Sequence, residues 1–182
     1  MSGVCVLLAD GFEEIEAVAI IDVLRRAELA VTIVGTSAKS VTGSHGIRIE
    51  ADTTLEQRAE TTWDAVVLPG GLPGATNLRD DERVQALLRR QHAAARPLAA
   101  ICAAPIALGA AGVLDGRRAT CYPGFEDGLH GARASDERVV VDGHIITSRG
   151  PGTAIEFALA LVARLKDERT ARQLEKGMLV RA

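Results

Sequence analysis

Short apolar runs alternate with amphipathic stretches along the first part of the chain. Residues 4–9 and 31–35 are apolar without alternation, as in strands that are buried on both faces. Between them, residues 14–28 carry apolar side chains at helical spacing. Two further apolar runs, 64–68 and 97–101, complete four predicted core strands. This strand–helix–strand order predicts a parallel sheet with helices on both faces, in a doubly wound α/β fold.

The remaining segments carry different patterns. Residues 40–49 alternate around two glycines and predict a small antiparallel hairpin, and residues 138–147 predict another that turns at Asp142-Gly143. Residues 116–138 lack periodicity and predict a surface loop with short elements. Further helices are expected at residues 81–94, from 103 to near 109–112, at 153–166 and at 167–176.

Composition narrows the classes of protein that fit this pattern. With 182 residues and 47% hydrophobic content, the chain has material for one core, so residues 1–182 are expected to form a single domain. The 21 Lys and Arg against 24 Asp and Glu give a formal net charge of -3, which argues against specific nucleic-acid binding. Aromatic residues make up 3% and are scattered, so no base-stacking surface is expected.

The N-terminus and the cysteines indicate a cytoplasmic protein. Residues 1–9 have no basic segment, and their apolar run is too short for a signal peptide or a membrane span. Three cysteines are an odd number without a Cys-x-x-Cys pair, which argues against a disulfide framework and a zinc site. The four histidines are not spaced as metal ligands, so we expect neither a metal nor another cofactor.

Cys102 is the first candidate for chemistry. It follows the apolar run 97–101 and precedes a helical pattern, so its thiol lies at a strand-to-helix turn. Unpaired N–H groups at a helix start favour the thiolate, which is the reactive form. The competing interpretation is an inert buried cysteine in a small-residue stretch. Cys5, in a core strand, and Cys121, in the irregular loop, are assigned to packing or incidental exposure.

Glu16 is the candidate acid. The loops after the first, third and fourth core strands should meet at one edge of the sheet, which brings Glu16 and Cys102 together. Glu16 occupies the first turn of an apolar helix, and burial would raise the pKa of its carboxyl group. A neutral carboxyl group can donate a hydrogen bond to a thiolate or sulfinate, or act as general acid and base. Alternatively, the glutamates here only complement the helix N-terminus.

A Pro-Gly-Gly turn follows the third core strand. Gly70 and Gly71 lie in this turn, and their backbone N–H groups are candidates for an oxyanion site beside the thiol. The alternative is that this segment is only a turn.

Four motifs together resemble the ThiJ/PfpI superfamily. They are Glu13–Glu16 (EEIE), Val67–Gly71 (VLPGG), Ala100–Pro105 (AICAAP) and Ser148–Thr153 (SRGPGT). They occur in the family's order over essentially the whole chain, and the resemblance is strongest to the parkinsonism-associated deglycase subgroup and its bacterial YajL-like relatives. The resemblance implies a flavodoxin-like fold in one class I glutamine amidotransferase-like domain, and a homodimer.

The resemblance also implies roles for individual residues. Cys102 matches the family's oxidisable cysteine, Glu16 its protonated partner and Gly71 the backbone donor beside it. Arg26 matches an arginine that helps to form an anion pocket near the cysteine. His45 stands where related chains carry a second arginine that crosses from the partner subunit.

Many family members have a histidine near the cysteine that acts as a proton shuttle. Alignment with the family places Gly131 at that position and His130 one residue away. His130 therefore serves as the shuttle after a local shift of the loop, or it is a solvated loop histidine.

Two functions follow from the resemblance. In the first, a Cys102 thiolate adds to methylglyoxal, glyoxal or glyoxal adducts of amino and thiol groups, while Glu16, with or without His130, moves protons. In the second, the protein is a sensor of oxidative stress or a chaperone, in which Cys102 oxidises to a sulfinate. A peptidase is not expected without a Cys–His pair and an orienting acid. A class I amidotransferase would carry glycines where Ala100 and Ala104 stand.

Overall fold

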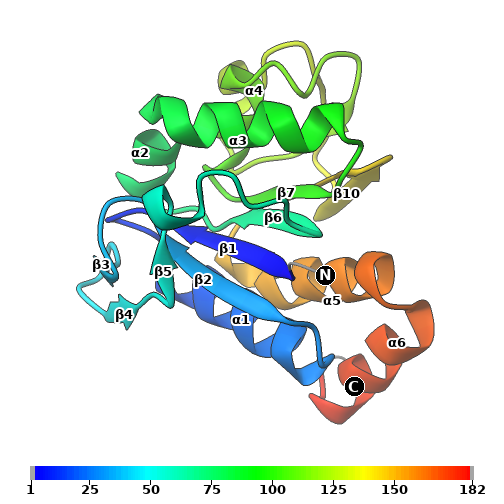
Figure 1. The fold of residues 1–182 in the computed structure, drawn as a ribbon. Coiled ribbons are helices and arrows are strands. Elements are labelled where there is room, and N and C mark those ends of the chain that lie inside the picture. Colours follow the sequence, from blue (N-terminus) through cyan, green and yellow to red (C-terminus); the bar gives the residue numbers. More distant parts are fainter. Residues whose placement is uncertain (1–2, 181–182) are drawn as a thin grey trace.

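A seven-stranded sheet forms the centre of the computed structural model, which describes residues 3–180 (Figure 1). The strand order is β10-β11-β7-β6-β1-β2-β5, and the neighbours are parallel apart from β10 and β11. The strands are β1 (Val4–Leu8), β2 (Val31–Gly35), β5 (Thr53–Thr54), β6 (Ala65–Leu68), β7 (Leu98–Ile101), β10 (Val139–Asp142) and β11 (Ile145–Ser148). The predicted α/β fold with a mainly parallel sheet is confirmed.

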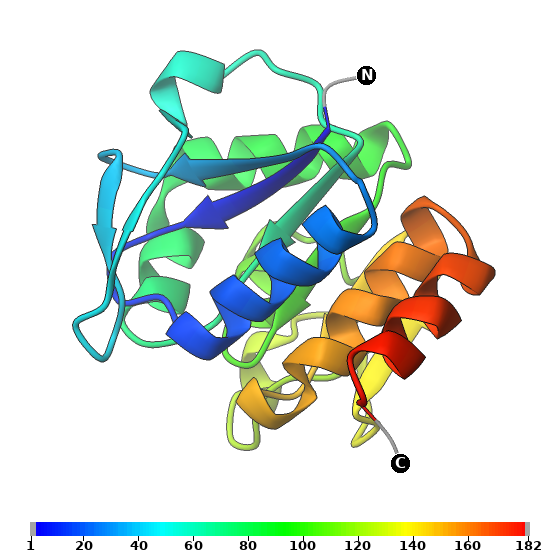
Figure 2. The same ribbon diagram turned by 90° about the horizontal axis from the view of Figure 1, so that it is seen from below.

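Helices cover both faces of the sheet. They are α1 (Glu14–Arg26), α2 (Gly74–Asp80), α3 (Glu82–Ala93), α4 (Pro105–Ala110), α5 (Ala154–Leu165) and α6 (Glu168–Gly177). One face carries α2, α3 and α4, and the other carries α1 and α5, with α6 packed against α5 (Figures 1 and 2). The doubly wound arrangement predicted from the order of elements is therefore present.

The central strands are buried along their whole length. Every residue of β1, β6 and β7 is buried, which explains why their sequences are apolar without alternation. The strand β7 is built from small residues, LAAI, and brings the chain to the cysteine at its carboxyl end. The largest fully buried side chains include Trp63, Phe12 and Phe157.

Both predicted hairpins form. Strands β3 (Ser40–Thr42) and β4 (Arg48–Glu50) make a separate antiparallel pair. In the second hairpin Asp142 pairs with Ile145, so the turn residues are Gly143 and His144, one position later than predicted. Its second strand, β11, also pairs in parallel with β7 and is a core strand of the main sheet. This second role was not predicted, because the hairpin pattern alone does not show which strand it joins.

The helix α2 was also missed. It begins at Gly74, directly after Pro73, and its residues GATNLRD include weak helix formers. Its packing against α4 compensates for this low propensity. The predicted loop at 116–138 contains the short strands β8 (Arg118–Ala119) and β9 (Arg133–Ala134). In the part of the chain that the structure describes, no helix is long and apolar enough to cross a bilayer.

Candidate active site

Cys102 lies in the turn between β7 and α4. The helix begins only at Pro105, so the thiol precedes the helix instead of lying in its first turn. The backbone of Cys102 has a φ of 63°, a left-handed conformation that costs a residue with a Cβ about 1–2 kcal/mol. Its N–H donates to the carbonyl of Ser148 (3.0 Å), and its carbonyl accepts from the N–H of Tyr122 (2.8 Å). These two contacts hold the strained residue in place.

Glu16 faces inward from the first turn of α1, as predicted. Its side chain is fully buried, and its Oε2 accepts a hydrogen bond from the N–H of Gly70 at 2.7 Å. Its Oε1 has no hydrogen-bond partner among the described residues. Burial raises the pKa of Glu16 to about 7, although the contacts with Gly70 and Cys102 lower it in part. A carboxyl group of this kind exchanges protons near neutral pH.

Gly70 brings the cysteine and the glutamate together. A Cβ at Gly70 would lie 2.6 Å from the Cβ of Cys102 and 2.8 Å from Oε2 of Glu16. Only a glycine therefore fits between the two side chains. The next residue, Gly71, has a φ of 91°. Its N–H donates a hydrogen bond to the sulfur of Cys102, which lowers the pKa of the thiol. The two glycines thus have different roles: Gly70 binds the carboxylate, and Gly71 faces the thiol.

The resting thiol of Cys102 is neutral. Burial and the charge of Glu16 raise the pKa of the thiol to about 12, while the N–H groups of Gly71 and Ala103 lower it. The predicted stabilisation by backbone N–H groups is present, but burial and the neighbouring carboxylate outweigh it. Protonation of Glu16 removes the repulsion, so a thiolate at Cys102 is favoured when the proton resides on Glu16.

His45 contacts glutamates other than Glu16. Its Nδ1 lies 2.9 Å from Oε2 of Glu14 and 3.5 Å from Oε2 of Glu13. Its backbone N–H also donates to Oε1 of Glu14 at 2.7 Å. Burial raises the pKa of Glu14, but the hydrogen bonds from His45 and Ile47 outweigh it and bring the pKa to about 2. Within one chain, His45 therefore binds the glutamates at the start of α1 and does not contact Cys102 or Glu16.

The structure does not place Arg26 at the cysteine. Arg26 is the last residue of α1 and lies ten positions after Glu16, a rise of about 15 Å along the helix. Its Nε donates to Asp22 at 2.6 Å, and its side chain is 53% exposed. Within one chain, the structure therefore does not bring Arg26 to the cysteine, and the anion pocket that the family resemblance implies stays a prediction.

His130 is exposed and lines a different cavity. That cavity, of about 230 Å³, is also lined by Ile106 and Phe125, and neither Cys102 nor Glu16 is among its lining residues. Tyr122, which sequence analysis missed, lies closer to the site, because its N–H binds the carbonyl of Cys102. No periodicity or motif in the irregular loop marks this residue.

The other two cysteines are buried, as expected for packing residues. Burial raises the pKa of the Cys5 thiol far above its usual value and that of Cys121 to about 11. Cys102 differs from both because a buried carboxyl group, that of Glu16, is hydrogen-bonded to its thiol, whereas Glu126 acts on Cys121 only through its charge.

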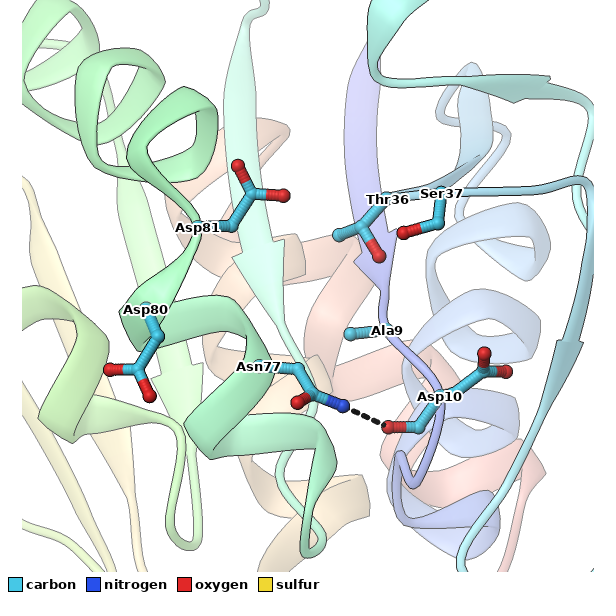
Figure 3. A pocket seen from close by; sticks show the side chains of 7 residues that line it. All are labelled: Ala9, Asp10, Thr36, Ser37, Asn77, Asp80 and Asp81. Atoms are coloured by element: carbon cyan, nitrogen blue, oxygen red, sulfur yellow. Dashed lines mark hydrogen bonds between the residues drawn. The ribbon is translucent and has the colours of Figure 1, made fainter.

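A polar cavity of about 400 Å³ lies beside the carboxyl ends of β1 and β2 (Figure 3). Its three acidic residues are already engaged: Asp80 pairs with Arg79, Asp81 pairs with Arg83, and Asp10 accepts a hydrogen bond from the N–H of Thr42. Asn77 donates to the backbone carbonyl of Asp10 at 2.9 Å across its floor (Figure 3). None of the cavity's lining residues is a cysteine or a histidine, so the thiol and carboxyl pair remain the candidate active site.

Comparison with known proteins identifies the family of the chain. Residues 2–164 match the DJ-1/PfpI family. The chain belongs to the DJ-1/PfpI family. Protein dj-1beta of Drosophila melanogaster is 43% identical over 178 residues, which cover 96% of this chain and 95% of the relative. The crystal structure of Drosophila DJ-1beta superposes with a TM-score of 0.93 at 42% identity and covers 98% of both chains.

Other DJ-1/PfpI relatives differ in length and in name. The chain spans 41% and 46% of two longer Arabidopsis thaliana relatives, Protein DJ-1 homologs B and A. A Caenorhabditis elegans relative named glutathione-independent glyoxalase DJR-1.2 is 36% identical, with 97% of this chain and 95% of the relative covered. A structure described as Toxoplasma gondii DJ-1, oxidized, has a TM-score of 0.93 at 38% identity and covers 97% of both chains.

Proposed function

We propose that this DJ-1/PfpI protein converts methylglyoxal to lactate without glutathione, and releases glyoxal adducts by the same chemistry, in the cytoplasm. The observation that carries the proposal is the buried carboxyl group of Glu16, which has a pKa of about 7 and contacts the thiol of Cys102. Neither of the other two thiols among the described residues has a buried carboxyl partner of this kind. The name of the Caenorhabditis elegans relative supports an aldehyde substrate. Free thiols agree with a reducing compartment.

The first step forms a bond between sulfur and carbon. Glu16 takes the thiol proton, and the Cys102 sulfur attacks the aldehyde carbon of methylglyoxal. Protonated Glu16 then gives its proton to the oxygen of the former aldehyde, which yields a hemithioacetal. The N–H of Gly71, which faces the sulfur, stabilises negative charge during this attack.

The second step is an internal oxidation and reduction. Ionised Glu16 removes the hydrogen of the hemithioacetal carbon as a proton, and the hydroxyl proton of that carbon passes to the neighbouring carbonyl oxygen through an enediol. Protonated Glu16 then gives its proton to the second carbon. The first carbon is thereby oxidised and the second reduced, so that no external oxidant is needed. The product is a lactoyl thioester, and water cleaves its carbon–sulfur bond to release lactate and the Cys102 thiol.

Lactate formation from methylglyoxal tests the proposal in glutathione-free buffer. We expect Cys102→Ser to reduce turnover at least about 100-fold, because a hydroxyl group is a far weaker nucleophile. Cys121→Ser is the matched control and should retain turnover, since Cys121 has no carboxyl partner of this kind. Full turnover by Cys102→Ser would disprove cysteine catalysis.

A second candidate is an oxidation sensor or chaperone. The buried Oε1 of Glu16 lacks a hydrogen-bond partner, and a protonated Glu16 can donate from it to a sulfinate oxygen at Cys102. Two molecules of hydrogen peroxide would convert the thiol to a sulfinic acid and leave two molecules of water. Mass spectrometry after mild peroxide treatment should locate two added oxygens on Cys102, fewer of them in Glu16→Ala. Earlier oxidation of Cys5 or Cys121 would refute the sensor.

We also propose that the protein forms a homodimer through the start of α1. Ile15 and Val18 lie on one helix face and are 62% and 51% exposed, and Ile47 beside them is 58% exposed. Such an apolar group is unusual on a monomer surface. Light scattering should find a dimer that Val18→Asp dissociates. Val141→Asp, at an equally exposed valine of β10, should leave the dimer intact. A monomeric native protein would refute the proposal.

A further inference from the structure

The polar cavity at the carboxyl ends of β1 and β2 has the size and position of a ligand site. Its volume of about 400 Å³ lies within the range of small-molecule pockets, about 300–1,000 Å³. The strands β2 and β6 lie on opposite sides of β1, so the strand order reverses there. Crevices beside such a reversal, at the carboxyl ends of parallel strands, are where open α/β sheets bind ligands. Neither Cys102 nor Glu16 lines this cavity, so it is separate from the candidate active site.

A hydroxyl group in this cavity lacks a hydrogen-bond partner. It belongs to Thr36, which directly follows β2 and is only 7% exposed. The backbone of Thr36 is satisfied, because its N–H donates to the carbonyl of Leu8 (2.9 Å) and its carbonyl accepts from Arg83 (3.1 Å). Its Oγ1 forms no hydrogen bond with the described residues, and Figure 3 shows it directed into the cavity. A polar group on a nearly buried side chain normally has a partner, and a molecule in the cavity would supply one.

The walls of the cavity are fixed by hydrogen bonds. The Nη2 of Arg83 donates to Oδ2 of Asp81 at 2.6 Å and to the carbonyl of Thr36 at 3.1 Å, so it ties the start of α3 to the end of β2. At the floor, Nδ2 of Asn77 donates to the carbonyl of Asp10 at 2.9 Å, which leaves Oδ1 of Asn77 without a partner among the described residues (Figure 3). The polar groups are therefore in place before a ligand arrives, which lowers the entropic cost of binding.

We propose that this cavity binds a neutral polyhydroxylated molecule of the sugar class. The hydroxyl groups of Thr36 and Ser37 can donate and accept, while the amide oxygen of Asn77 and the carboxylate of Asp81 accept. A sugar ring carries neighbouring hydroxyl groups that also donate and accept, so it can satisfy this mixed set. Hydrogen bonds from hydroxyl groups to a carboxylate are short and strong, which makes Asp81 the anchor of the site.

Charge and lining argue against other occupants. A cation has little to gain, because Asp80 and Asp81 are already paired with Arg79 and Arg83. An anion would be repelled by the three carboxylates of the lining. The lining residues that the structure describes include no aromatic ring, and the one apolar residue among them is Ala9. A nucleobase would therefore find no surface on which to stack, so a free sugar fits better than a nucleoside.

Titration of the full chain with methyl β-D-riboside tests the proposal. This probe has no free aldehyde, so it cannot react with Cys102. The backbone amide signals of Thr36, Ser37 and Asn77 should shift and saturate in heteronuclear NMR spectra. Thr36→Val keeps the shape of the side chain and should weaken binding at least about 5-fold, because the hydroxyl group is lost. Thr62→Val, at an exposed threonine outside the cavity, is the matched control and should bind like the native chain.

Two further probes separate the sugar from the other occupants. Adenosine should bind no more tightly than methyl β-D-riboside, and Ca²⁺ should cause no saturable shift at the cavity. Tighter binding of adenosine would overturn the assignment to a free sugar, and saturable binding of Ca²⁺ would overturn the neutral occupant.

The central outcome is the response to the riboside itself. The proposal is overturned if methyl β-D-riboside causes no saturable shift at these residues. It is also overturned if Thr36→Val and Asn77→Ala, both folded by circular dichroism, bind the riboside unchanged. None of these results depends on lactate formation, so the proposed function is tested separately.

Discussion

Glu14 and Glu16 are two buried carboxyl groups on the same helical turn, yet their environments have opposite effects. Burial raises the pKa of both, but hydrogen bonds from His45 and Ile47 bring Glu14 to about 2, whereas Glu16 stays at about 7. Glu16 accepts one backbone hydrogen bond, from Gly70, and leaves an oxygen unpartnered. The difference shows that the number of donors around a buried carboxylate, and not burial alone, decides its charge.

The two environments imply different uses. The side chain of Glu14 fastens the loop between β3 and β4 to the start of α1, through contacts with the backbone of His45 and Ile47. Glu16 accepts only one backbone hydrogen bond, from Gly70, and its raised pKa keeps a proton available next to Cys102 near neutral pH. One turn of helix thus holds a structural carboxylate and, in our proposal, a catalytic one.

The largest expected effect is on turnover. Glu16→Gln keeps the shape of the side chain and an acceptor for the Gly70 N–H, but it cannot carry a proton between atoms. We expect the rate of lactate formation to fall about 100- to 10,000-fold, as for loss of a general acid–base group. Glu14→Gln is the matched control and should retain turnover within about 10-fold. Steady-state kinetics with methylglyoxal measures both.

This comparison fails if the two variants lose turnover equally, since the loss would then follow from disruption of the helix turn. It also fails if Glu16→Gln retains native turnover, because no other group of suitable pKa lies against Cys102 among the described residues.

The next effect is on the pH dependence of stability. The pKa of Glu16 in the folded chain lies above its usual value of 4.5, so the unfolded chain loses this proton first as pH rises. The free energy of unfolding should therefore fall between about pH 4.5 and 7, by on the order of 3 kcal/mol, and Glu16→Gln should abolish this fall. Urea unfolding of both proteins across this range measures it.

Glu14 should show the opposite sign. Its folded pKa of about 2 lies below 4.5, so its contribution is complete above about pH 4.5 and is lost as pH falls toward 2. Glu14→Gln should remove the loss of unfolding free energy below about pH 4.5. It should leave the fall in unfolding free energy between about pH 4.5 and 7 as in the native protein. If Glu14→Gln and Glu16→Gln changed the pH dependence of the free energy of unfolding in the same direction, the opposite charge states assigned to Glu14 and Glu16 would be wrong.

The smallest effect is expected at the surface. His45→Ala removes the ring contact with Glu14 but leaves the two backbone hydrogen bonds to that carboxylate. Because the ring is 71% exposed, we expect almost no change in the free energy of unfolding measured with urea. A large loss of stability would show that the ring, and not the loop backbone, neutralises the carboxylates.

The main lines of the fold were readable from the sequence because burial imposes a pattern. Strands β1, β6 and β7 are apolar throughout since both of their faces are covered, and α1 has a helical apolar period. The helix α2 was not readable, because packing on α4 stabilises residues of low helix propensity.

The site was readable in part. Cys102, Glu16 and the two glycines could be predicted to meet because they follow neighbouring parallel strands. The partners of His45 could not, since they depend on how the loop between β3 and β4 folds over α1. The charge states also required three-dimensional information, because they depend on which N–H groups point at which oxygen.

The left-handed backbone of Cys102 has a consequence for engineering. A glycine adopts a φ of 63° without the cost that a Cβ brings, so Cys102→Gly relieves local strain while it removes the thiol. A selection for thermal stability alone would therefore favour loss of the nucleophile, and a selection for turnover would favour its retention. Libraries of stabilised variants should keep this position fixed.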